Sequence, residues 1–199
     1  KYSIKNVFGS LQTGGLDFSG AWPRIDYFEI FYEKTGVDLN IANKELLCKK
    51  VREMNIPNID LNAGFGRVID QVYKRLVRPE IKGPAFLIHH PVEISPLAKR
   101  KENEPNKTER FQILINASEI GNGFSELNDP LDQRARFEEQ ARLRESGDKE
   151  AQMIDEDFIS ALEYGMPPTG GFGVGIDRLF MAAAGLSSIR ETVFFPMMR

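Results

Sequence analysis

The stretch Gly165-Met166-Pro167-Pro168-Thr169-Gly170-Gly171-Phe172-Gly173-Val174-Gly175-Ile176-Asp177-Arg178-Leu179 carries the strongest structural signal in this chain. Four of the six residues from 170 to 175 are glycines, which bare the backbone and let another group approach closely. Arg178 follows in the first turn of a helix predicted over residues 176–184, and its planar guanidinium suits phosphate oxygens. The stretch matches neither a Walker loop nor a dinucleotide fingerprint. Because glycine clusters also serve turns and tight packing, it leaves a phosphate site and a structural role both open.

A second informative stretch is Glu119-Ile120-Gly121-Asn122-Gly123-Phe124-Ser125-Glu126-Leu127-Asn128-Asp129-Pro130. Within it, Asn122, Phe124 and Glu126 recur at every second position and would share one face of a strand. That face would present an amide, an aromatic ring and a carboxylate, which suit a ligand with an aliphatic stem and an ammonium group. The alternative is that Phe124 belongs to the core and that Glu126 is a surface acid.

Together the two stretches resemble the class II aminoacyl-tRNA synthetases. The glycine-rich stretch with Gly175-Ile176-Asp177-Arg178 resembles motif 3 of that class, and residues 119–130 resemble the preceding strand in lysyl-tRNA synthetases. Further matching pieces are Trp22-Pro23-Arg24-Ile25, Glu33-Lys34-Thr35-Gly36, the run from 90 to 99 and Phe195-Pro196. The resemblance covers residues 1–199. It implies the C-terminal part of a catalytic domain, without motifs 1 and 2 and without the anticodon-binding domain.

The resemblance also implies an activity and a set of site residues. A lysine–tRNA ligase activates L-lysine with ATP to lysyl-adenylate and transfers it to tRNA(Lys). Arg178 would be the catalytic residue that holds the γ-phosphate, Glu126 would recognise the substrate ε-ammonium, and Asn122 its carboxylate end. The residues implied in ATP binding are Glu119, Ile120, Gly175 and Arg178, and those implied in lysine binding are Asn122, Phe124, Glu126 and Gly171.

Magnesium is the cofactor that the resemblance implies alongside ATP, with Glu119 as a ligand. Glu119 is out of phase with the face that carries Asn122, so it reaches the same site only if the backbone bulges or turns near Gly121. Gln112 stands where lysyl-tRNA synthetases usually carry a second metal-binding glutamate. Since hard cations prefer carboxylates and a neutral amide adds no charge, we expect weaker Mg²⁺ binding than with Gln112→Glu.

The resemblance names ATP, L-lysine and tRNA(Lys) as partners, and a homodimer through motif 1 at full length. Because motif 2 is not recognisable, we expect the 199-residue chain alone to activate lysine poorly or not at all. Two alternatives stay open. One is the lysyl-tRNA-synthetase-like paralogue that attaches β-lysine to elongation factor P, and the other is a non-catalytic synthetase-like module.

Composition is that of an ordinary globular protein, with 41% hydrophobic and 28% charged residues among 199. No apolar run approaches the ~20 residues that span a bilayer, so no membrane association is expected. The single cysteine, Cys48, cannot form an internal disulfide, which favours a reducing, cytoplasmic setting. A net charge of -3 argues against gripping nucleic acid by bulk electrostatics, but not against local contacts to an RNA end.

Local patterns predict an α+β fold, with an antiparallel sheet flanked by helices and no repeating βαβ unit. Strands are predicted over residues 85–88, 110–116 and 119–126, with a further strand pair within 1–18. Helices are predicted from Asp26 to Gly36, from about 43 to 54, from about 66 to 78 and from Pro130 to about 145. Residues 99–108 are predicted to form an exposed, mobile loop. The spacing of Asp132 and Arg136 predicts an ion pair on a solvated helix face.

Overall fold

The computed structural model describes residues 20–145 and 153–195, so the strand pair predicted within residues 1–18 lies outside the described residues. Its centre is a five-stranded sheet in the order β1-β2-β5-β6-β7. The first pair is parallel and the other three pairs are antiparallel, which confirms the α+β prediction. The strands of this sheet are β1 (Arg24–Asp26), β2 (Ala85–Ile88), β5 (Arg110–Ile115), β6 (Ser118–Ser125) and β7 (Gly170–Val174).

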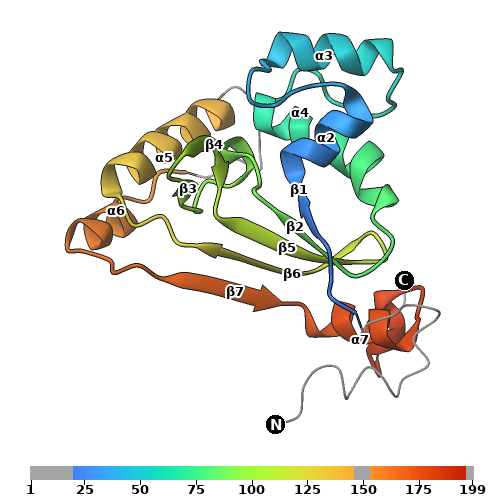
Figure 1. Cartoon of the computed structure of the whole chain (residues 1–199). Helices are drawn as coiled ribbons and strands as arrows, with labels where there is room; N and C mark the ends of the chain where they lie inside the picture. The colour runs from blue at the N-terminus through green and yellow to red at the C-terminus, as the bar shows by residue number, and fades with distance from the viewer. Residues whose placement is uncertain (1–19, 146–152, 196–199) are drawn as a thin grey trace.

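Helices cover the sheet from several sides (Figure 1). Helices α2, α3 and α4 gather beside β1 and β2, α5 and α6 lie near the start of β7, and α7 lies beyond its end (Figure 1). The bounds are α2 (Tyr27–Thr35), α3 (Lys44–Glu53), α4 (Phe65–Val72), α5 (Pro130–Glu145), α6 (Glu156–Glu163) and α7 (Ile176–Ala184). No helix in the described part of the chain is long and apolar enough to cross a membrane.

The two faces of the sheet carry two separate apolar clusters. Leu87 and Leu114 pack with buried residues of α2, α3 and α4 in the larger cluster. Ile115 and Ile120 pack with partly buried Leu179 of α7 in the smaller one. Alternate residues of a strand point to opposite faces, so β5 contributes to both clusters. The face with the larger cluster, on which Leu114 and Gln112 lie, continues into the candidate site.

Capping side chains set the limits of the first helix. The Asp26 carboxylate accepts hydrogen bonds from the N–H groups of Phe28 at 2.8 Å and Glu29 at 3.3 Å, and Gly36 ends the helix with φ 70°. The helix predicted over residues 66–78 begins at Phe65. It is α-helical only to Val72, and then continues as a π-helical turn over Tyr73–Val77 and a 3₁₀ turn over Arg78–Glu80.

The loop prediction for residues 99–108 is wrong. Strands β3 (Arg100–Lys101) and β4 (Glu104–Thr108) form a two-stranded sheet there. Lys107 folds inward and binds Asp26 at 3.2 Å and Glu104 at 2.7 Å, while the buried Thr108 hydroxyl donates to the His90 carbonyl at 2.8 Å. Polar residues therefore form ordered structure here because distant parts of the chain supply partners for them.

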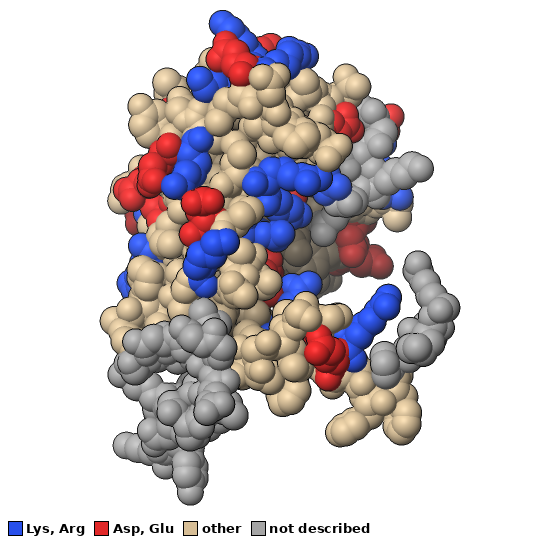
Figure 2. All heavy atoms as spheres, turned by 90° about the vertical axis from the view of Figure 1, so that its right-hand side faces the viewer, with Lys and Arg blue, Asp and Glu red and all other residues tan. Residues whose placement is uncertain are grey.

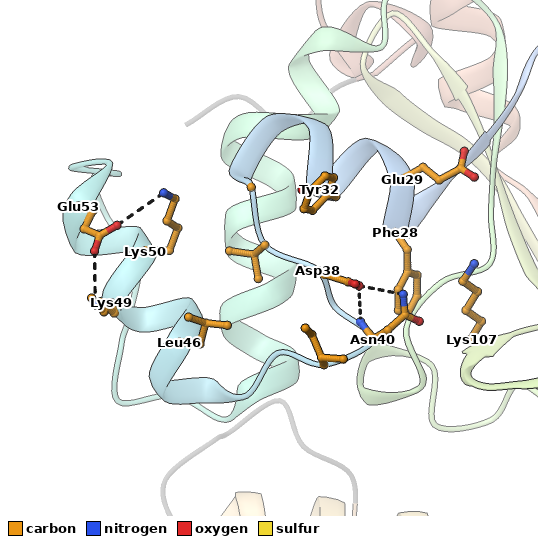
Figure 3. Close-up of a pocket in the computed structure, with 13 residues that line it drawn as sticks. Phe28, Glu29, Tyr32, Asp38, Asn40, Leu46, Lys49, Lys50, Glu53 and Lys107 are labelled. Atoms are coloured by element: carbon orange, nitrogen blue, oxygen red, sulfur yellow. Dashed lines mark hydrogen bonds and ion pairs between the residues drawn. The ribbon is translucent and has the colours of Figure 1, made fainter.

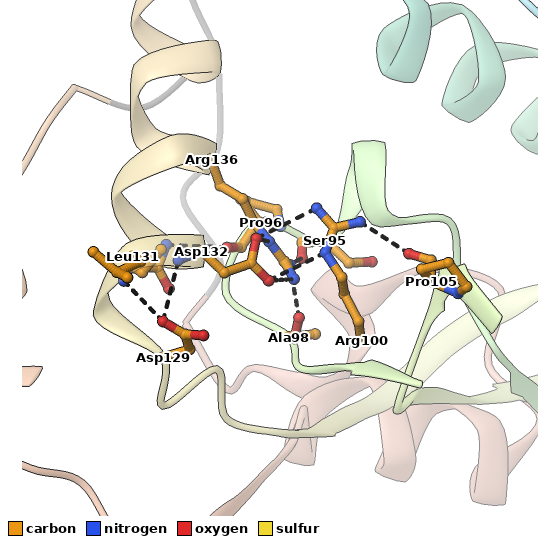
Figure 4. Close-up of polar contacts among 10 residues, drawn as sticks. Ser95, Pro96, Ala98, Arg100, Pro105, Asp129, Leu131, Asp132 and Arg136 are labelled. Atoms are coloured by element: carbon orange, nitrogen blue, oxygen red, sulfur yellow. Dashed lines mark hydrogen bonds and ion pairs between the residues drawn. The ribbon is translucent and has the colours of Figure 1, made fainter. Parts of the chain in front are cut away.

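The solvated-face prediction for the first turns of α5 is also wrong. The Asp132–Arg136 ion pair forms, at 2.8 Å, but the Arg136 side chain is only 6% exposed. Its Nη1 donates to the carbonyls of Ser95 at 3.0 Å and Ala98 at 2.7 Å, and Arg100 also binds Asp132 (Figure 4). This group of contacts anchors α5 to the segment between β2 and β3, and the segment returns below as a support of the candidate site.

Candidate functional site

A cavity of about 420 Å³ opens between β6, β7 and the start of α7. All eight residues predicted for ATP and lysine binding line it, although they come from two separate stretches of the chain. They are Glu119, Ile120, Asn122, Phe124, Glu126, Gly171, Gly175 and Arg178. Asp177 and Ile189 line the same cavity and were not predicted. The antiparallel pairing of β6 with β7 brings the two stretches together, since Asn122 lies opposite Gly173 and Phe124 opposite Gly171.

A β-bulge in β6 brings Glu119 to this site. Ile113 of β5 pairs with Gly121 and Leu114 pairs with Glu119, so Ile120 is the extra residue. The shift moves Glu119 onto the face that carries Asn122, which is the condition for Glu119 to reach the same site. The Ile120 side chain turns into the smaller core, where it is 2% exposed, and its carbonyl accepts a hydrogen bond from the Gly175 N–H at 2.8 Å. The cavity is therefore bordered at position 120 by main chain.

Gln112 does not line this cavity, but it contacts the site through Glu119. Its Nε2 donates to Glu119 Oε2 at 2.8 Å. Since a carboxylate only accepts, the amide must present its NH₂ group to Glu119, and its oxygen becomes a metal donor only if the amide turns over. Glu119 by itself fits Mg²⁺, which is commonly held by one or two carboxylates together with substrate phosphates. Among the described residues there is no group of three or more His, Cys, Asp and Glu placed to hold a metal ion.

Glu126 offers an unsatisfied negative charge. Within the described part of the chain, no hydrogen bond or ion pair is formed by its side chain, and burial raises its pKa. Gly171 makes room for it, because a Cβ built at position 171 would overlap Glu126 Oε1. At Gly173 a Cβ would meet no atom within 4 Å in the described part of the chain, its two neighbours in sequence apart, so that glycine faces open cavity. A partly buried carboxylate without a cation is suited to receive an ammonium group.

Arg178 stands in the first turn of α7, after the helix N-cap Gly175. Its Nη1 donates to the main-chain carbonyl of Glu119 at 3.0 Å. The contact fixes the guanidinium beside Glu119, so that a positive and a negative group lie at the same part of the cavity. Such a pair is suited to phosphate oxygens and their counter-ion.

Sequence reasoning missed Arg110, whose Nε donates to the Asn122 side-chain oxygen at 2.8 Å. Arg110 lies on the same face of β5 as Gln112 and opposite Phe124 of β6. The alternation of β5 residues could have placed it near the site, but only with the register of β5 against β6 in hand.

A larger cavity, of about 790 Å³, lies between α2, the segment after it and α3 (Figure 3). Three of its charged side chains pair with one another. Lys49 and Lys50 both lie within ion-pair distance of Glu53, at 3.9 and 3.5 Å, and Asp38 accepts hydrogen bonds from Asn40 (Figure 3). Size alone therefore does not identify the site. The smaller cavity holds the Glu126 carboxylate together with a wall lined by glycines.

Comparison with known proteins gives a consistent result. The profile of the tRNA synthetases class II (D, K and N) matches residues 1–199. The chain is 44% identical over 202 residues to the lysine–tRNA ligase of Fervidobacterium nodosum, a match that covers 100% of this chain and 39% of that protein. It is 47% identical over 200 residues to the lysine–tRNA ligase of Thermotoga maritima, covering 98% of this chain and 39% of that protein. The chain thus spans about two fifths of the length of these curated relatives.

Proposed function

The chain belongs to the class II tRNA synthetases (D, K and N), and from that premise we propose that it forms the lysine- and ATP-binding part of a lysine–tRNA ligase. The single observation that carries the proposal is the unpaired Glu126 carboxylate in a cavity whose opposite strand is stripped of side chains at Gly171 and Gly173. The reaction is the condensation of L-lysine with ATP to lysyl-adenylate and pyrophosphate, followed by transfer of the lysyl group to tRNA(Lys).

The lysine side of the cavity offers three complementary groups. The Glu126 carboxylate would accept hydrogen bonds from the ε-ammonium, and the Phe124 ring would cover the aliphatic stem. Asn122 would bind the carboxylate end. Their order along β6 matches the order of these groups along an extended lysine. A charge-assisted contact at the ammonium also gives selectivity, because an analogue without it leaves the Glu126 carboxylate buried without a partner.

The ATP side of the cavity supplies charge and shape. The Arg178 guanidinium would hold the γ-phosphate, and Gly175 would let the adenosine approach the backbone. Glu119 would hold Mg²⁺, which supplies charge neutralisation to the phosphates when bound. A carboxylate oxygen of lysine attacks the α-phosphorus and pyrophosphate leaves. The protein's side chains align the two anions and offset their repulsion.

Further partners and the cellular setting belong to the same proposal. tRNA(Lys) is the acceptor, a homodimer is the expected assembly of the full-length enzyme, and the cytoplasm is the expected location. Figure 2 shows a group of Lys and Arg side chains near the middle of one face, in a chain whose net charge is -3. The net charge argues against a grip on RNA by bulk electrostatics, so the proposed contact with tRNA is a local one at the RNA end.

The experiment that tests this function is ATP–pyrophosphate exchange with the protein expressed in its complete natural reading frame. α-Lysine, β-lysine and the other standard amino acids are compared. We expect exchange with α-lysine alone, and weak or no exchange from residues 1–199 expressed by themselves. Exchange mainly with β-lysine would move the assignment to the paralogue that modifies elongation factor P. No exchange with any amino acid would favour a non-catalytic module.

A further inference from the structure

Arg110 connects the candidate site to the segment that follows β2. Its Nε donates to Asn122 Oδ1 at 2.8 Å, and its Nη1 donates to the carbonyl of Ile94 at 2.7 Å and the hydroxyl of Ser95 at 3.0 Å. Burial lowers the pKa of the guanidinium, and the nearby Glu119 charge opposes that shift. An arginine stays charged under these conditions, so all three contacts are charge-assisted.

These contacts determine which end of the Asn122 amide faces the cavity. A guanidinium has only N–H donors, so the amide must present its oxygen to Arg110. The two N–H groups of Asn122 Nδ2 are then the end left for a ligand, and Asn122 lines the cavity. The site therefore offers a hydrogen-bond donor at this point. A donor suits a carboxylate, and it does not suit an ammonium group.

Ser95 is in turn held by α5. Its hydroxyl accepts from Arg110, while its carbonyl accepts from Arg136 Nη1 at 3.0 Å. Figure 4 shows Arg136 reaching from α5 to Ser95 and Ala98, with Asp132 bound to the same guanidinium. Arg110 is thus tied at both ends. One end binds Asn122, and the other binds a segment fixed by a buried arginine.

We propose that Arg110 is a positioning residue, which locks the Asn122 amide so that its NH₂ group donates to the carboxylate of the amino-acid substrate. Ser95 and Arg136 form the support that keeps Arg110 in place. The inference rests on the proposed lysine-binding function and adds to it the group that gives Asn122 its polarity. Arg110 itself does not contact the substrate.

The test uses two ligands that differ only in the carboxylate, L-lysine and cadaverine, titrated calorimetrically into the protein expressed in its complete natural reading frame. Arg110→Lys keeps the charge but cannot span the three acceptors. We expect it to weaken L-lysine binding about tenfold and to change cadaverine binding by less than about twofold. Ser95→Ala removes one support and is expected to give a smaller loss, again for L-lysine alone.

Asn122→Asp is the matched variant, because it is isosteric and keeps an acceptor for Arg110 while it removes the donor. Its melting temperature should not fall, since the new carboxylate pairs with the guanidinium. Its affinity for L-lysine should drop at least about tenfold, and its affinity for cadaverine should not drop.

Parallel losses of L-lysine and cadaverine in Arg110→Lys would overturn the inference, because they would indicate general collapse of the site. Unchanged L-lysine affinity in Arg110→Lys or Asn122→Asp would also overturn it. If the unmodified protein bound neither ligand, the proposed function would fail, and this inference would fail with it. That outcome is distinct from any difference between variants.

Discussion

Alanine at position 171 would place a methyl group against the Glu126 carboxylate. A Cβ built on Gly171 overlaps Glu126 Oε1, and among the described residues, chain neighbours apart, the only other atom within 4 Å is Glu126 Cδ at 3.6 Å. The overlap thus involves the far end of a flexible side chain and no backbone. We expect the carboxylate to move by about 1 Å to regain ordinary van der Waals contact, while β6 and β7 stay paired.

The displaced carboxylate would lose its charge-assisted contact with the lysine ammonium. Hydrogen bonds to charged groups contribute about 1.5–3 kcal/mol. Their loss corresponds to a roughly 10- to 150-fold higher dissociation constant for L-lysine. Calorimetric titration of Gly171→Ala with L-lysine measures this loss, and thermal unfolding checks the fold. Gly170→Ala is the control, because the nearest atom that its methyl would meet among the described residues, chain neighbours apart, is the Phe124 carbonyl oxygen, at 3.8 Å. Equal lysine affinities in the two variants would refute the reasoning.

Three further changes test other parts of the structure. Gly123→Ala should lower the free energy of unfolding by about 1–3 kcal/mol, as measured by urea titration. Its Cβ would lie 2.8 Å from the Phe111 ring and 2.9 Å from a β7 carbonyl oxygen. An unchanged urea midpoint would contradict this packing. Asp132→Asn should cost about 3 kcal/mol, because it leaves the buried Arg136 guanidinium without its counter-charge. Burial raises the pKa of the Asp132 carboxyl, but hydrogen bonds from Arg136 and Arg100 lower it by more. The pKa therefore lies below its ordinary value of 3.8. The stabilisation by Asp132 is therefore present above pH 3.8 and is lost as the pH falls through the folded-state pKa. The free energy of unfolding of the variant should fall less steeply with decreasing pH on the acid side. An identical acid-side slope would count against the ion pair. Gln112→Glu should reach half-maximal ATP–pyrophosphate exchange at lower Mg²⁺, and equal half-saturation would argue against a metal role at this position.

Local sequence patterns were sufficient for the elements that carry the site. β2 has the predicted bounds of 85–88, β6 spans 118–125 where a strand is predicted over 119–126, and α7 has the predicted bounds of 176–184. These signals are local, because glycines, caps and alternation act within a few residues. The conditional prediction of a bulge near Gly121 is also confirmed, and it places Glu119 on the face of Asn122.

Features that depend on distant partners were predicted wrongly or not at all. The β3–β4 hairpin is polar in sequence, and its Lys107 is drawn inward by Asp26, which lies 81 residues earlier. The i,i+4 spacing of Asp132 and Arg136 is typical of a solvated helix face. The Arg136 guanidinium is nevertheless buried, because it donates to carbonyl groups about 40 residues earlier in the chain. Arg110 acts on Asn122 through the β5–β6 register. In each case the deciding partner lies outside any local window, so propensity and periodicity carry no information about it.

The most direct test of the central claim compares activation of L-lysine with that of L-norleucine, which has the same chain without the ε-ammonium. The measurement is kcat/KM for ATP–pyrophosphate exchange in the complete natural reading frame, with and without Glu126→Gln. We predict that the unmodified protein prefers L-lysine by roughly 10⁴-fold, since a site built for a polar group rejects its absence by that order. Glu126→Gln should lose most of this preference through weaker use of L-lysine. Full retention of the preference in Glu126→Gln would contradict the assignment of Glu126 to the lysine ammonium.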